Sequence, residues 1–392
     1  MKDYWMENEN KKINSKKIVA SVIISIIVVL CIIISICYVA NKEFRNWIDI
    51  QILNKEISQE KVTTIDLDEG QTSNVYAFYK YIGVLNKNKF DVYGCTGNQE
   101  TSLDVQITNP LFNSSNRFLA IGEQKGQKVY LIEDKKVVWD KQVEGNISQV
   151  YVNKNGYVAV TITGTSYKSV IQVIDPSGNV LFNTYLSSTI SVDVSISNDN
   201  KYLAIAEVDT SGTILQSNVR VISVEKAKTD PTNSEEENYK SEANKLIVNI
   251  EYQNKNKIVC MYEDAVSIMD NNKEENLFEN KDKKIIAQSI KLDGKIATIQ
   301  EESSGIFSAN SIVNIIDTEN QEKKEYTVNT TIKEMYSKGD IIALNLGTEV
   351  EFINTSGWLV KRYVASQEVT KVTLSKNIAG IIYRDKVEII NL

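Results

Sequence analysis

The sequence predicts an all-β fold, an eight-bladed β-propeller, preceded by one transmembrane helix. Three observations predict it. The stretch from Ile18 to Ala40 contains 23 residues without a charge. After it, short runs of β-branched and aromatic residues alternate with Asn, Asp, Gly and Ser, which is the composition of strands and turns. A pair of strand patterns then recurs eight times along the chain.

The apolar run is long enough to be a membrane anchor. As a helix it would extend roughly 34 Å at about 1.5 Å per residue, which exceeds the bilayer core. A cleaved signal peptide would have a shorter apolar region and a small-x-small cleavage site. The residues before Ala40 form a poor site of that kind, and Cys31 lies inside the run, where a lipoprotein signal would not place it. We therefore expect an uncleaved signal anchor.

The cations beside this run predict its orientation. Two cations follow it closely, Lys42 and Arg45, whereas five lysines precede it. Because the more basic flank stays in the cytoplasm, we expect a single-pass protein of the cell membrane with its propeller outside the cytoplasm. The predicted parts are a cytoplasmic tail over 1–17, a transmembrane helix over 18–40, a juxtamembrane helix or stalk over 41–58 and the propeller over 59–392.

Charge and cysteine content exclude some classes of function. The whole chain has a net charge of −7, and the residues after Ala40 alone carry −9 because the tail is basic. An acidic domain repels phosphate backbones, so no nucleic-acid partner is expected. Only two cysteines, Cys95 and Cys260, lie beyond the anchor. They fall in the first and fifth repeats, too far apart for a disulfide, and we expect two free, buried thiols.

The repeat consists of a strand with a small residue near its centre, followed by an apolar strand that usually ends in Asp or Asn. We expect the small residue to relieve crowding where neighbouring blades approach the axis. Spacings between its copies run from 36 to 55 residues, as in four-stranded propeller blades. The copies lie at Gly83, Ala120, Ala159, Ala204, Val259, Ala297, Ala343 and Ala379.

Closure of the ring needs one more strand, because the last copy stops at Leu392 after its third strand. The alternating segment from Lys61 to Leu67, KVTTIDL, precedes the first copy. We predict that it supplies the outer strand of the last blade and so joins the two ends of the domain. Seven blades remain an alternative, because the first inner strand, Val75 to Tyr79, is short.

The pattern resembles WD40-like and quinoprotein-like β-propellers over roughly Lys61 to Leu392. The Gly-His element of WD repeats is missing because the chain contains no histidine. The overall plan, and the segment NKFDVYGCTGNQETSLDV from Asn88, resemble an uncharacterised family of membrane-anchored propeller-like proteins of Gram-positive bacteria, a domain of unknown function. That resemblance implies a propeller in the cell envelope.

The absence of histidine removes the commonest general base, histidine-ligated zinc and the Ser-His-Asp and Cys-His nucleophile pairs. The sequence also lacks a P-loop, a CxxC pair and a nucleophile elbow. We therefore predict no catalytic residues, no metal site and no cofactor, and we lean against an enzyme. A carboxylate pair of the glycosidase kind stays open because folding assembles such pairs in space.

Four predicted loops between second and third strands are long, from Gly122, Thr163, Glu207 and Gln300. Long loops on one face of a rigid scaffold commonly bind partners. The segment from Glu225 to Lys245 is polar, and we expect it to replace or precede a degraded outer strand in blade four. The candidate binding residues in the long loops are Tyr167, Asp209, Leu215, Glu301, Glu302 and Phe307.

These observations predict a non-catalytic binding or scaffold module that holds a protein or a cell-wall ligand through its long-loop face. One alternative is a glycan-acting enzyme with a carboxylate pair. The other is an envelope sensor that relays a signal through its anchor. The sequence leaves the ligand, the oligomeric state and any use of the central channel open.

Overall fold

The computed structural model describes residues 15–41, 44–45, 48, 62–68, 74–242, 245–253, 257–270, 273–279, 285–303, 309–376 and 378–392. The chain divides into two compact units, Met1–Ser58 and Gln59–Leu392. The first unit contains helix α1 (Ser15–Ala40), and Val22–Ala40 is long and apolar enough to cross a membrane. Of the segment expected to be a juxtamembrane helix, Phe44, Arg45 and Ile48 are helical and Asn41 is not; the remainder lies outside the described residues.

The second unit consists of eight four-stranded antiparallel sheets, the blades. Blades one to four contain β2 (Val75–Phe78), β3 (Tyr81–Asn86), β4 (Lys89–Tyr93) and β5 (Gln99–Asp104); β6 (Pro110–Ser115), β7 (Phe118–Glu123), β8 (Lys128–Glu133) and β9 (Lys136–Gln142); β10 (Asn146–Val152), β11 (Val158–Thr163), β12 (Ser169–Ile174) and β13 (Val180–Leu186); and β14 (Thr189–Ile196), β15 (Tyr202–Asp209), β16 (Gln216–Ser223) and β17 (Glu235–Lys240).

The other four blades continue this order, except that the last takes its outer strand from the beginning of the domain. They contain β18 (Ile247–Tyr252), β19 (Ile258–Tyr262), β20 (Ala265–Asp270) and β21 (Lys273–Glu279); β22 (Ile285–Leu292), β23 (Lys295–Ser303), β24 (Ala309–Asp317) and β25 (Lys323–Val328); β26 (Glu334–Lys338), β27 (Ile341–Asn345), β28 (Glu349–Asn354) and β29 (Leu359–Val364); and β30 (Lys371–Ser375), β31 (Ile378–Ile382), β32 (Lys386–Asn391) and β1 (Thr63–Asp66).

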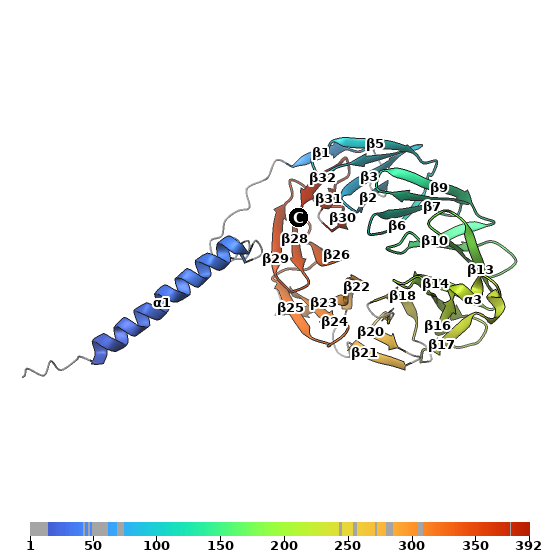
Figure 1. Ribbon diagram of the computed structural model, residues 1–392. Coiled ribbons are helices and arrows are strands. Elements are labelled where there is room, and N and C mark those ends of the chain that lie inside the picture. The colour runs from blue at the N-terminus through green and yellow to red at the C-terminus, as the bar shows by residue number, and fades with distance from the viewer. Residues whose placement is uncertain are drawn as a thin grey trace, which may run out of the picture. The chain divides into compact units, whose positions relative to one another are not determined.

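The blades stand in a closed ring around a central opening (Figure 1). The first strand of each blade is innermost, and each inner strand contacts the inner strand of the next blade, with β30 returning to β2. The eight-bladed β-propeller predicted from the sequence is therefore confirmed, and the seven-bladed alternative is excluded.

The ring closes by pairing of the two ends of the domain. Strand β1 runs antiparallel to β32, with Thr63 opposite Ile389 and Asp66 opposite Lys386. Ile65 is buried and packs in one cluster with residues of blades one and eight, among them Ile82 and Val387. This confirms the closing strand predicted in Lys61–Leu67 and leaves blade eight without an exposed third-strand edge.

The recurring small residues do not lie at the axis as expected. They occupy the second strands, where all of them are buried between neighbouring sheets. At Gly83, a built Cβ would lie 2.0 Å from Cζ of Phe90, whose ring fills the space that the glycine leaves. The small side chains therefore allow close packing within and between blades rather than clearance at the axis.

The polar segment of blade four forms regular structure, which corrects the expectation of a degraded strand. A short helix, α3 (Val224–Ala227), and a 3₁₀ turn, η2 (Pro231–Asn233), precede β17, which pairs with β16 in the usual position. The Ser223 hydroxyl accepts from the Lys226 amide at the start of α3, and Asp230 caps the 3₁₀ turn.

Both cysteines outside α1 are free, but only one is buried. Cys260 lies on β19 and is fully buried, whereas Cys95, in the turn after β4, is exposed. The expectation of two buried thiols is thus wrong for Cys95, because the turn between third and outer strands lies at the rim.

The closing strand predicts a stability effect. Substitution Ile65→Ala should lower the free energy of unfolding by about 2–4 kcal/mol, because it removes buried methyl groups from the joint between blades one and eight. The matched change Thr64→Ala, at an exposed neighbour on the same strand, should alter it by less than about 0.5 kcal/mol. Urea denaturation of the two variants measures the difference; equal effects would contradict a closing role for β1.

Candidate functional site

The inner strand of each blade is a sheet edge, and its backbone donors have no further strand to pair with. Polar side chains of the preceding blade accept from these donors. The Val152 amide donates to Asn113 Oδ1 at 3.0 Å, and the Ala77 amide donates to Thr373 Oγ1 at 2.7 Å. Blade-to-blade hydrogen bonds of this kind give the channel a polar wall.

The same arrangement is doubled between blades four and five. The Ile250 amide donates to Asp193 Oδ2 at 2.9 Å, and the Tyr252 amide donates to Ser195 Oγ at 3.0 Å. The second carboxylate oxygen of Asp193 accepts from Nε2 of the Gln149 side chain, on blade three. One buried carboxyl group therefore joins three consecutive blades.

A chain of hydrogen bonds continues from there across the channel wall. Ser195 Oγ donates to Tyr151 OH at 3.0 Å, and that hydroxyl donates to Glu251 Oε1 at 3.0 Å. Lys291 Nζ of blade six binds the other oxygen of Glu251 at 2.5 Å. The chain of contacts therefore runs through four blades, three to six.

Burial and charge shift the pKa values in this network. Burial raises the pKa of Asp193, and the positive charge of Lys291 only partly opposes that rise. Burial by itself would lower the pKa of Lys291, but the negative charges of Glu251 and Asp193 outweigh it and raise that pKa. Lys291 is therefore held as a cation beside Glu251.

The channel contains a cavity of about 920 Å³. Residues of inner strands and of the turns that follow them line it. Lysines outnumber carboxylates five to two in this lining, which leaves a surplus of positive charge inside an acidic domain. The charged lining residues are Lys154, Glu251, Lys291, Asp293, Lys338, Lys371 and Lys376.

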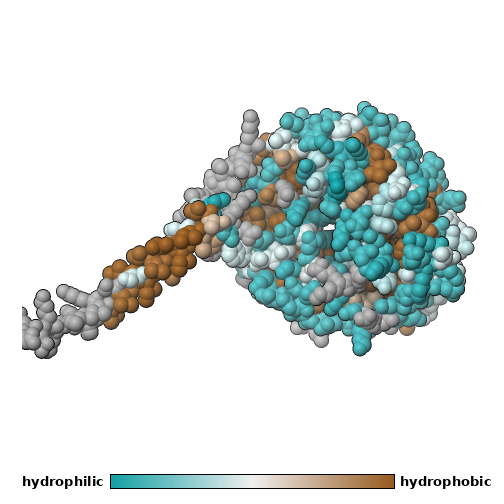
Figure 2. All heavy atoms as spheres, viewed as in Figure 1, coloured by the Kyte–Doolittle hydropathy of each residue, from teal (hydrophilic) through white to brown (hydrophobic). Residues whose placement is uncertain are grey.

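The cavity lies toward one end of the channel. Its lining includes Tyr79, Asn116 and Gly339, which belong to turns between inner and second strands. Strands within a blade are antiparallel, so the loops between second and third strands lie at the other end of the channel. In Figure 2 the ring is mostly hydrophilic around its central opening, whereas the surface of α1 is almost continuously hydrophobic.

Of the predicted binding residues, the four whose side chains the structure describes do not line this cavity; they are Tyr167, Asp209, Leu215 and Glu301. Tyr167 and Leu215 lie in the loops β11–β12 and β15–β16 and are exposed, and Asp209 ends β15. Asp209 accepts from the Ser211 amide at 2.9 Å and from its hydroxyl at 2.6 Å, and these bonds lower the pKa of Asp209.

The structure describes only some of the binding residues predicted in blade six. Glu301 is exposed on β23 rather than in a loop. Glu302 belongs to the same strand, and its side chain lies outside the described residues, as does the whole of Phe307. The structure thus brings Tyr167, Asp209 and Leu215 to one face, the end of the blades where second strands join third strands. We call this end the long-loop face.

Exposed apolar side chains gather on this face. Outside α1, eleven large apolar side chains are exposed among the described residues, and six of them lie where blades three to five meet the long-loop face. The rings of Tyr167 and Tyr185 are in contact, with centroids 4.7 Å apart. We call this set the loop-face patch; it consists of Tyr167, Tyr185, Ile190, Ile214, Leu215 and Val248.

Sequence reasoning found two members of the loop-face patch and missed the others. Loop length pointed to Tyr167 and Leu215, but Tyr185, Ile190 and Val248 are strand residues whose exposure depends on their place at strand ends. The lysines of the cavity could not be recognised as one group in the sequence, because they come from four different blades. Within the described residues, no three His, Cys, Asp or Glu side chains gather in a way that could hold a metal ion.

A family model described as "Family of unknown function (DUF5711)" matches residues 53–392, which include the whole propeller. The chain belongs to the DUF5711 family. No curated protein matches this DUF5711 chain.

Several solved structures are similar to this DUF5711 propeller. BamB from Moraxella catarrhalis has a TM-score of 0.53 at 12% identity, covering 85% of this chain and 99% of that chain. Apo AztD from Citrobacter koseri has 0.50 at 10%, covering 80% and 91%. Chaetomium thermophilum Sqt1, bound to the N-terminus of the ribosomal protein L10, has 0.50 at 11%, covering 83% and 98%. At these identities the likeness establishes the fold alone.

The buried carboxyl group of Asp193 predicts a pH effect. Its pKa in the folded state is raised, so the fold binds this proton more tightly than the unfolded chain, whose Asp has a pKa of about 3.9. The contribution of Asp193 to the free energy of unfolding should therefore fall as pH rises above about 4. In the variant Asp193→Asn this dependence should be absent. Urea denaturation of both proteins between about pH 4 and 7.5 tests this linkage; a difference that stays constant with pH would contradict it.

Proposed function

We propose that the protein is a single-pass membrane protein whose extracytoplasmic propeller binds a protein partner through the long-loop face, without catalysis. The observation that carries this proposal is the loop-face patch, six exposed apolar side chains on adjacent blades. Aromatic and aliphatic side chains exposed together on a rigid scaffold are typical of protein interfaces.

The chemistry of the patch favours a protein over a carbohydrate of the cell wall. Ile190, Leu215 and Val248 offer no hydrogen bonds and would gain by meeting an apolar surface. Lys168 stabilises the loops beneath the patch, since its Nζ binds Ser188 O at 2.8 Å and Thr210 Oγ1 at 3.1 Å. A surface held in one conformation loses less entropy on binding.

The proposed location and orientation in the membrane depend on α1 and on the charged residues beside it. The apolar side chains of α1 are exposed along the helix, as in a segment that contacts lipid. The excess of lysines before α1 supports a cytoplasmic N-terminus. A propeller can hold a protein segment, as the structure of Sqt1 with a piece of a ribosomal protein illustrates for that protein.

The patch predicts the effect of surface charge on partner binding. The double variant Ile214→Asp/Leu215→Asp should reduce crosslinking to the partner in intact membranes at least about tenfold, because two carboxylates would be desolvated in the interface. Both side chains are exposed, so the fold should be unaffected. Removing the whole segment 207–218 is unsuitable, because Glu207 is fully buried and pairs with Arg220 Nε at 2.7 Å.

The matched control is Val180→Asp. Val180 is also exposed and apolar, but it begins β13 at the opposite end of the blade. Crosslinking followed by mass spectrometry should identify the same partner with this control as with the unchanged chain. The proposal would be refuted if the control variant lost as much crosslinking as the double variant, or if the double variant still crosslinked fully.

The exposed thiol predicts a topology result. In right-side-out spheroplasts, a membrane-impermeant maleimide should label the chain at Cys95, because this thiol is exposed on the propeller. The variant Cys95→Ser should lose the label, since Cys260 is buried. Labelling that appears only after lysis would place the propeller in the cytoplasm and refute the proposed orientation.

A further inference from the structure

We propose that the channel cavity binds a small phosphorylated polyol or sugar. This site is separate from the loop-face patch, because its lining comes from inner strands and from the turns at the opposite end of the blades. A cavity of about 920 Å³ accommodates a ligand of that size.

The first support is unneutralised positive charge. Two of the five lysines in the lining have partners: Lys291 binds Glu251 at 2.5 Å, and Lys338 Nζ donates to the Ser114 carbonyl. The other three, Lys154, Lys371 and Lys376, make no ion pair or side-chain hydrogen bond with any residue that the structure describes. Lys154 and Lys376 lie in turns after inner strands, and Lys371 begins β30. Three lysines that line one cavity and make no ion pair with the described residues, beside only two carboxylates, favour a bound anion.

The second support is that these lysines are not needed for the fold. The edge donors of inner strands are satisfied by uncharged or acidic groups, such as Asn113 and Thr373. A lysine supplies donors only and satisfies no backbone N–H group. The surplus of cations in the channel therefore lacks a structural cause, although the domain as a whole is acidic.

The number of cations favours phosphate over carboxylate. The described lining contains no arginine, so lysines alone would supply the positive charge that meets the anion. Lysine acts as a point charge, and several of them together match the higher charge of a phosphate monoester. The excess of three positive charges in the lining exceeds what a single carboxylate would neutralise.

The remaining lining suits hydroxyl groups and a carbon skeleton. Asn116 offers donors and an acceptor, and Tyr79 adds an aromatic ring to the lining. The hydroxyls of Ser337 and Ser375 already bond to Ser289 and to the Tyr79 carbonyl, so they offer acceptor lone pairs. Tyr79 has a φ of 48°, a left-handed conformation that is rare for a bulky residue. Its carbonyl accepts from Ser375 Oγ at 2.7 Å, so the strained turn is fastened to blade eight.

The test is isothermal titration calorimetry on the detergent-solubilised full chain. Glucose 6-phosphate and glycerol 3-phosphate should bind, whereas glucose and glucuronate should bind at least about tenfold more weakly. The triple variant Lys154→Gln/Lys371→Gln/Lys376→Gln should weaken the phosphorylated ligands by about tenfold or more. Binding should also weaken as salt is raised, because the contacts are ionic.

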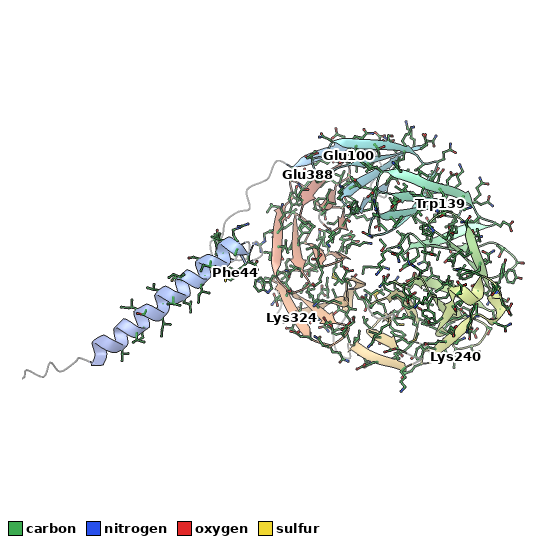
Figure 3. The ribbon with its side chains drawn as sticks, viewed as in Figure 1. Phe44, Glu100, Trp139, Lys240, Lys324 and Glu388 are labelled. Atoms are coloured by element: carbon green, nitrogen blue, oxygen red, sulfur yellow. The ribbon has the colours of Figure 1, made fainter. Side chains whose placement is uncertain are left out.

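The control removes two other exposed lysines that make no ion pair or side-chain hydrogen bond with the described residues, Lys136→Gln/Lys240→Gln. Figure 3 places Lys240 on the outer rim of the ring, away from the channel. This variant should bind as the unchanged chain does, and circular dichroism should show that both variants are folded.

Four results would overturn the proposal. The first is that neither phosphorylated ligand binds, and the second is that glucuronate binds as tightly as they do. The third is that the control variant weakens binding as much as the triple variant. The fourth is that a phosphodiester oligomer binds more tightly than both phosphorylated monomers. The last would assign the cavity to a polymer rather than to a small molecule. Partner crosslinking through the loop-face patch would be unaffected by any of these outcomes.

Discussion

The unpaired edge of every inner strand is the constraint on which this propeller depends. A ring of separate sheets leaves one row of backbone donors in each blade facing the axis, where no further strand can pair with them. The chain satisfies several of them from the side, with a polar residue on the neighbouring inner strand. Asp193 is the most demanding case, because it accepts from both Gln149 and Ile250 while it is almost fully buried.

That constraint separates two kinds of polar group in the channel. Asn113, Ser195 and Thr373 have structural partners, and the fold explains their presence. Lys371 and Lys376 have no such partners among the described residues. The distinction matters because a polar channel alone is expected of this architecture, whereas unpaired cations in an acidic domain call for a ligand.

Antiparallel pairing within each blade divides the propeller into two ends with different chemistry. The turns after the inner strands surround the cationic cavity, and the loops after the second strands display the apolar patch. A ligand in the cavity and a protein on the patch could therefore be bound at the same time. The rigid ring between the two ends would carry any coupling, since neighbouring blades share the hydrogen bonds of the inner strands.

The sequence by itself determined the repeat, its eight copies and its closure. These features depend on local alternation and turn chemistry, so Lys61–Leu67 could be recognised as a strand without its partner and matched to the missing position. Long loops that contain Tyr167 and Leu215 were visible for the same reason. Tertiary structure alone decided where the small residues pack, that Cys95 is exposed, and which side chains line the channel. Lys154 and Lys371 belong to blades three and eight, and only the curvature of the closed ring brings such distant positions to one cavity.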